Sequence, residues 1–156
     1  MAVALSPPAD GRGLTRAERR LGWLLRLLAL LFALGAVGFV LTPDETVARV
    51  DRVGALIGLP TLVRTGAPVV SDFWLPLAIG NMASMAVAAW YAAGDVRRRR
   101  SLVHVIVTSA LASAATAVLL FVRWAAAFSF VAAALVNLAV AIVVVSALRA
   151  APGERV

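Results

Sequence analysis

The stretch Gly94–Ser101 (GDVRRRRS) is a short charged break in the middle of a chain that is otherwise mostly apolar. Gly94 suits the left-handed position that closes a helix, and the four arginines complement the negative end of that helix. Ser101 can cap a helix that follows. The stretch therefore predicts a loop between two helices, and the segments on either side can be placed relative to it.

Composition indicates that the solvent for most of the chain is lipid. Of its 156 residues, 62% are hydrophobic, and the mean hydropathy is +0.94. Soluble globular chains contain about 45–50% apolar residues. A water-soluble fold of this length could not bury so much apolar surface, so we predict an integral membrane protein.

The basic residues are all arginine, fifteen in number against eight acids, and the net charge is +7. In a soluble protein this balance is typical of nucleic-acid binding. Here the arginines flank apolar segments, where they orient the chain and contact anionic headgroups. We therefore expect membrane lipids as partners and no nucleic acid. The absence of cysteine excludes disulfides and thiolate chemistry.

The N-terminal part is predicted to be a flexible basic tail, residues 1–20, followed by a first membrane span at Leu21–Leu41. Thr15 and Glu18 have the spacing of a capping box, so a helix should begin before the span. The 21 residues of the span suffice to cross a bilayer. Arg26 lies near one edge, where its side chain either extends to the headgroups or faces inward as a ligand for an anion or headgroup.

A short amphipathic helix is predicted after the first span. Thr42 is a cap residue, Pro43 favours the first helical position, and Asp44 and Glu45 favour the first turn. Apolar and charged residues then alternate up to Gly58–Pro60 (GLP), where the helix should end. Such a helix would lie in the plane of the membrane surface, and an ordinary ordered loop is the alternative.

Three further spans follow from hydropathy and from interfacial aromatic residues. The second has Trp74 near its start and Trp90 near its end. Residues 102–148 contain one charge, Arg123. A single helix of that length would measure ~70 Å against a ~30 Å hydrocarbon core, so the segment must fold back at Arg123.

The predicted fold is an all-α integral membrane four-helix bundle with an amphipathic interfacial helix between its first two spans. The membrane domain covers residues 21–148, and residues 149–156 form a short C-terminal tail. Its spans are residues 21–41, 72–93, 102–121 and 125–148.

Arginines are unevenly divided between the two sides of this arrangement. With the four-arginine loop in the cytoplasm, both termini join it on a side that holds ten arginines: Arg12, Arg16, Arg19, Arg20, Arg97, Arg98, Arg99, Arg100, Arg149 and Arg155. The other side holds four: Arg49, Arg52, Arg64 and Arg123. Because basic loops stay inside, we predict a multi-pass protein of the bacterial cytoplasmic membrane with both termini cytoplasmic.

Polar side chains within the spans predict a buried layer near the middle of the bilayer. The predicted members are Asn81, Ser84, Ser109, Ser113, Thr116 and Asn137. They either join the helices by hydrogen bonds or form a small polar binding site. Small residues at four-residue spacing also predict close helix packing, for instance Gly80, Ser84 and Ala88.

No motif predicts catalysis, and we expect no enzymatic activity, no cofactor and no metal. The chain has no glycine-rich phosphate loop, and no carboxylate lies deep within a predicted span. His104 is expected to pack at the interface or to sense pH. Arg97, Arg98, Arg99 and Arg100 are expected to contact anionic lipid, or alternatively an acidic partner.

The order of parts resembles that of the DoxX-like group of small bacterial membrane proteins. The shared features are a first span, a segment that starts at Pro43 and closes on Gly58–Pro60, and three more spans. Leu41 and Thr42 stand where such proteins carry a basic residue. The resemblance covers about residues 21–148, implies a four-helix membrane bundle, and assigns no functional residues.

Two functions fit these patterns. The first is a non-enzymatic accessory or assembly subunit that packs against a membrane protein partner, or against its own copies, through small-residue helix faces. The second is a small carrier or ligand-binding bundle that uses the polar layer with Arg26.

Overall fold

The structure is a computed structural model that describes residues 14–59, 74–123 and 127–151. The regular structure of these residues is entirely helical, as predicted, and consists of α1 (Arg16–Leu41), α2 (Pro43–Leu56), α3 (Trp74–Gly94), α4 (Arg100–Arg123) and α5 (Phe128–Ala150). Helices α1, α3, α4 and α5 are long and apolar enough to cross a membrane. Residues 1–13 of the predicted tail (1–20), the segments 60–73 and 124–126, and residues 152–156 lie outside the described ranges.

The first helix begins with the predicted capping box. The hydroxyl of Thr15 accepts a hydrogen bond from the backbone N–H of Glu18 at 3.2 Å, and Oε2 of Glu18 accepts one from the backbone N–H of Thr15 at 2.7 Å. These two bonds satisfy N–H groups that have no partner within the helix. Helix α1 therefore starts at Arg16, five residues before the apolar run that begins at Leu21.

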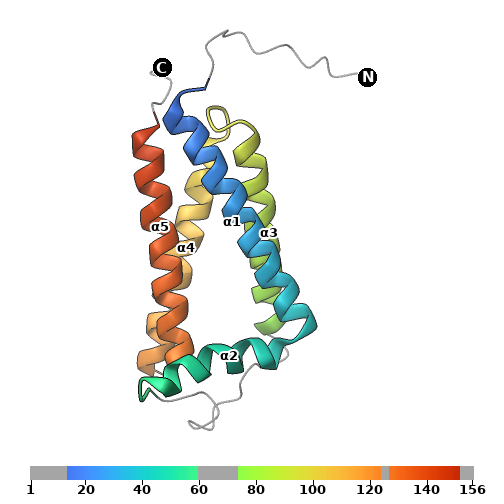
Figure 1. The fold of residues 1–156 in the computed structure, drawn as a ribbon, viewed down its shortest axis with the longest axis vertical. Helices are drawn as coiled ribbons and strands as arrows, with labels where there is room; N and C mark the ends of the chain where they lie inside the picture. Colours follow the sequence, from blue (N-terminus) through green and yellow to red (C-terminus); the bar gives the residue numbers. More distant parts are fainter. Residues whose placement is uncertain (1–13, 60–73, 124–126, 152–156) are drawn as a thin grey trace.

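Helix α2 forms where the sequence predicts it, and Figure 1 shows it lying crosswise at one end of the four long helices. Pro43 is its first residue, and Gly58 follows its end with a φ of +76°, which glycine adopts without strain. The expected cap at Thr42 is not made. Its hydroxyl instead donates back to the carbonyl of Gly38, across 3.4 Å.

The long helices pack mainly as two pairs, α1 with α3 and α4 with α5. Contacts between α3 and α4 and between α1 and α5 are fewer. Within the described ranges the backbone of α1 does not come close to that of α4, nor that of α3 to that of α5, although their side chains share one core. The pairs meet at the end where α1 begins and α5 ends, and they separate toward α2 (Figure 1).

The apolar core lies at the end of the bundle where the two pairs meet. Its fully buried members include Leu21 and Leu25 of α1, Val103 and Ile106 of α4, and Val144 of α5. The other half presents large apolar side chains to its surroundings, among them Leu34, Val37, Val40, Val118, Leu119 and Val122. An outward apolar surface on spanning-length helices suits lipid as the solvent.

Helix α2 docks on the start of α5. Gly54 is buried there, and a Cβ atom at this position would overlap the side chain of Phe128. Ala127 is fully buried nearby, with Val47 of α2 and Phe130 packed against it. Close approach at Gly54 is therefore what allows α2 to bridge the separated ends of the two pairs.

Candidate functional site

The charged loop between α3 and α4 is fastened to the start of α1 by an ion pair. Arg97 donates from Nε to Oε1 of Glu18 at 2.6 Å and from Nη2 to Oε2 at 2.9 Å. The side chain of Glu18 is 1% exposed, and that of Arg97 is 24% exposed. Two parallel charge-assisted bonds fix both the distance and the orientation of the two groups.

Glu18 lies one turn before the apolar run that begins at Leu21. Its hydrogen bond from Arg97 is the main cause that lowers the pKa of this carboxyl to about 2, from a usual 4.5. Bonds from Thr15 act in the same direction, and burial opposes them. Glu18 is therefore ionised throughout the physiological pH range.

Two further arginines of the loop bond to backbone carbonyls. Arg100 donates from Nη2 to the carbonyl of Ala151 at 2.6 Å, which ties the end of α5 to the start of α4. Arg99 donates from Nη1 to the carbonyl of Tyr91 at 2.7 Å, and its guanidinium lies 5.4 Å from the centre of the Tyr91 ring. The loop thus holds the ends of α1, α3, α4 and α5 together.

The four arginines expected to contact lipid or an acidic partner have different surroundings in the structure. Arg97 and Arg100 use their guanidinium groups within the chain, because a carboxylate and a carbonyl lie within reach. Arg98 pairs with Asp95 at 3.8 Å but stays exposed, as does Arg99. The outward charge of the loop is therefore carried mainly by Arg98 and Arg99.

Arg26 lies on the outside of α1. It is exposed, and its guanidinium sits 5.3 Å from the ring centre of the exposed Trp23. The side chain therefore does not enter the space between the helix pairs, and the inward-facing alternative does not fit this geometry.

The six residues predicted to form one polar layer do not come together. Ser109 donates to Oδ1 of Asn81 across 3.4 Å, which joins α4 to α3. Asn137 donates to the carbonyl of Ala133 in its own helix at 2.8 Å. Ser84 and Thr116 are exposed, and Ser113 is partly buried. The helix pairs separate and α3 does not meet α5, so a closed layer cannot form in the single chain.

The small residues divide into those that pack inside the bundle and those that do not. A Cβ at Gly35 would touch Sδ of Met82 at 3.3 Å, and one at Gly22 would touch the carbonyl of Ala93 at 3.6 Å. At Gly80 a Cβ would meet no atom of the described residues within 4 Å. Within the described residues, Gly80 is therefore left without a neighbouring helix, and Ser84, one turn further along α3, is exposed.

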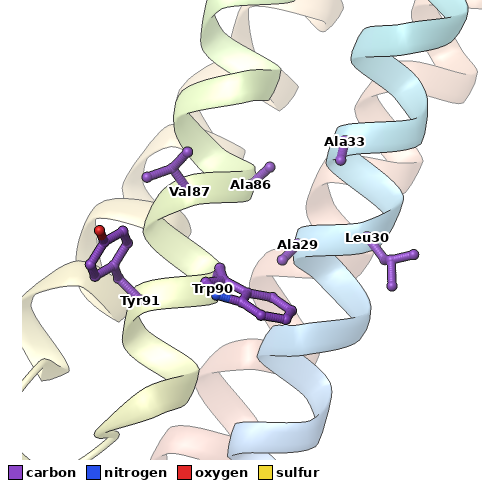
Figure 2. A pocket seen from close by; sticks show the side chains of 7 residues that line it. All are labelled: Ala29, Leu30, Ala33, Ala86, Val87, Trp90 and Tyr91. Carbon is purple, nitrogen blue, oxygen red and sulfur yellow. The ribbon is translucent and has the colours of Figure 1, made fainter.

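Within the part of the chain that the structure describes, two shallow apolar grooves run beside α3. One lies between α1 and α3, with a volume of about 330 Å³, and Figure 2 shows Trp90 extending across it toward Ala29. The other lies beside α3 next to Leu102 of α4, with a volume of about 530 Å³, and Ala83 and Ser84 contribute to its lining. The sequence signals for these grooves are alanine and serine at helical spacing, which are too common in apolar helices to locate a groove by themselves.

The sequence pattern around Glu18 predicts only a capping role for it, and does not indicate the pairing with Arg97. The available signal was topological, because the tail and the loop are placed on the same side by the arginine count.

His104 is exposed on α4, and within the described residues no three histidine or acidic side chains gather as metal ligands.

Comparison with protein-family models, with curated proteins and with solved structures finds no match for this chain. The resemblance to the DoxX-like group stays a prediction.

Proposed function

We propose that this protein is a four-span subunit of the bacterial cytoplasmic membrane, with both termini cytoplasmic, and that it assists or assembles with another membrane protein. Four spanning-length apolar helices support membrane insertion. The start of α1, the arginine loop and the end of α5 share one end of the bundle, which supports a common side for both termini (Figure 1).

The unfilled small face of α3 is the observation that carries the accessory role. Helices in lipid associate through small residues that let their backbones approach closely, because apolar burial gives them no advantage over lipid. The other interior glycines already have neighbours, whereas Gly80 faces open space within the described residues and the exposed Ser84 lines a groove. A helix of a partner protein fits this face.

Affinity capture from native membranes in mild detergent tests the accessory role. We expect the wild-type chain to retain a partner in fixed stoichiometry and Gly80→Leu to lose it. A Cβ at Gly80 meets no atom of the described residues within 4 Å, so we expect Gly80→Leu to unfold at a temperature no lower than that of the wild type. Ala139→Leu, an exposed change on α5, is the matched control and should keep the partner. Recovery of the lone chain or of a homodimer contradicts the proposal.

A small carrier is the second candidate, favoured by the hydrogen bond between Asn81 and Ser109 on neighbouring helices. The chain lacks cysteine, so single-cysteine variants report water access without background labelling. Labelling of Ser109→Cys by a water-soluble maleimide in native membranes would favour the carrier. Protection of this position, with Arg98→Cys labelled after lysis, would favour the accessory subunit.

Maleimide labelling of single-cysteine variants also tests the orientation of the chain in the membrane. In intact spheroplasts, an impermeant maleimide should label Arg52→Cys on α2 and leave Arg98→Cys unlabelled until the membrane is opened. Labelling of Arg98→Cys in intact spheroplasts would reverse the proposed topology.

A further inference from the structure

We infer that the groove between α1 and α3 binds one anionic phospholipid, with an acyl chain along the groove and the phosphate at Arg26. This inference rests on the proposed membrane location and adds a ligand to it. The α1 wall carries Ala29, Leu30 and Ala33, and the α3 wall carries Ala86, Val87 and Trp90 (Figure 2).

Arg26 stands at one end of this groove. Residues four and seven positions apart share a helix face, so Arg26 projects from the same face as Leu30 and Ala33, about one turn nearer the arginine loop. Gly22 lies beside Ala93 and Gly35 beside Met82, and these contacts of an antiparallel pair place Arg26 level with Trp90. The groove is therefore lined by apolar side chains and has a cation at one end. This arrangement suits a ligand with an apolar tail and an anionic head.

The guanidinium of Arg26, at the end of the groove, is not neutralised by a carboxylate of the described residues and can bind an anion. Arg26 stacks on Trp23, and no carboxylate of the described residues pairs with it. Stacking on an aromatic face orients a cation without neutralising it. Arg26 and Trp23 lie near the start of α1, and Trp90 lies near the end of α3 at the same end of the bundle. An arginine and indoles at such positions match the depth of lipid headgroups.

A second copy of the chain is a poorer occupant than a lipid. The described acids at this end of the bundle are Glu18 and Asp95, and both are already engaged by arginines of the loop. Self-association through this groove would therefore add another Arg26 without an acid to balance it. A phosphodiester supplies the missing negative charge.

Native mass spectrometry of the full chain, released from nanodiscs of phosphatidylglycerol and phosphatidylcholine in equal amounts, tests the site. We expect the wild type to retain one phosphatidylglycerol and Arg26→Gln to lower that retention about fivefold, with little change for phosphatidylcholine. Arg149→Gln removes one exposed charge at the same end of the bundle and should retain the lipid as the wild type does.

The apolar half of the site is tested by Ala33→Leu, which fills the groove from an exposed position. This change should also lower phosphatidylglycerol retention, whereas Ala139→Leu on α5 should not. Equal phosphatidylglycerol retention by the wild type and Arg26→Gln overturns the inference. Loss of retention in Arg26→Gln but not in Ala33→Leu also overturns it, because only the headgroup would then be recognised. Displacement of the lipid by excess inorganic phosphate would overturn it in the same way.

Carbonate extraction distinguishes an error in the proposed membrane location from an error in the proposed lipid site. If alkaline carbonate releases the chain from membranes, the proposed location is wrong and the site falls with it. If the chain stays in the membrane pellet but shows no preference for phosphatidylglycerol, the lipid site alone is overturned.

Discussion

The carboxylate of Glu18, in the first turn of α1, accepts two hydrogen bonds from the guanidinium of Arg97, at 2.6 and 2.9 Å, although 79 positions separate the two residues in the chain. This pair joins the first helix to the loop that connects α3 and α4. It lies beside the buried core that begins at Leu21. The charged end of the bundle is therefore held by a specific contact as well as by apolar packing.

Removing one partner of this pair should destabilise the bundle. Glu18→Gln leaves the Arg97 cation without its counter-charge in a partly buried position, and the expected loss is about 3 kcal/mol of unfolding free energy. Thermal unfolding in detergent measures it. Glu45→Gln breaks an exposed pair with Arg49 on α2 and should cost no more than about 0.5 kcal/mol. Equal stability of the two variants would contradict the importance of the Glu18 contact.

The same pair predicts a dependence on acid. Because folding lowers the pKa of Glu18 from 4.5 to about 2, the carboxylate stabilises the folded chain fully above pH 4.5. That contribution is lost as the pH falls from 4.5 toward 2. We expect the difference in melting temperature between wild type and Glu18→Gln to shrink over this interval. A difference that stays constant down to pH 2 would show that the carboxyl charge is not responsible.

The contact between α2 and α5 predicts opposite effects for two glycines. Gly54→Ala places a methyl group against Phe128 and should destabilise the fold by about 1–3 kcal/mol. Gly80→Ala has free space and gains helix propensity, so it should be neutral or stabilise by up to about 1 kcal/mol. Thermal unfolding of both variants in one detergent gives the comparison. A stabilising Gly54→Ala would mean that α2 does not dock closely on α5.

The hydrogen bond between Asn81 and Ser109 should contribute little. A double-mutant cycle with Asn81→Leu and Ser109→Ala should give a coupling energy near 0.6 kcal/mol, the usual size for such bonds in membrane bundles. Asn137→Leu should show no coupling to Asn81→Leu, because Asn137 bonds within α5. Coupling between the two asparagines above 1 kcal/mol would indicate that the layer closes in the native membrane.

Local rules predicted most of the helix ends. Two local predictions for the loop between α3 and α4 were wrong: α4 begins at Arg100, so Ser101 lies inside the helix and does not cap it, and Gly94 ends α3 without a positive φ. Thr15 and Glu18 located the start of α1, Pro43 located the start of α2, and the charge at Arg123 located the end of α4. Each of these signals depends on neighbours within one turn, which a sequence displays directly.

Contacts between helices were harder to predict from the sequence. Nothing in the spacing of Arg97 and Arg98 indicates that the first pairs with Glu18 while the second stays exposed, because that depends on how the loop turns between its helices. The separation of the two helix pairs was likewise missed, since the small-residue faces of α3 and α5 predict close packing for both. The length of α2 and its docking at Gly54 decide instead how far apart the pairs lie.

The position of α5 also sets an order of events during translation. This helix supplies Phe128 beneath α2 and the Ala151 carbonyl that receives Arg100, so these two contacts, one at each end of the bundle, form only after the last of the described helices has left the ribosome. A nascent chain that has emerged from the ribosome as far as Arg123 contains all of α1 and α3. These helices can therefore pack together, and Glu18 can pair with Arg97. Its crosswise helix, however, stays undocked until synthesis has passed α5, on the order of a few seconds later.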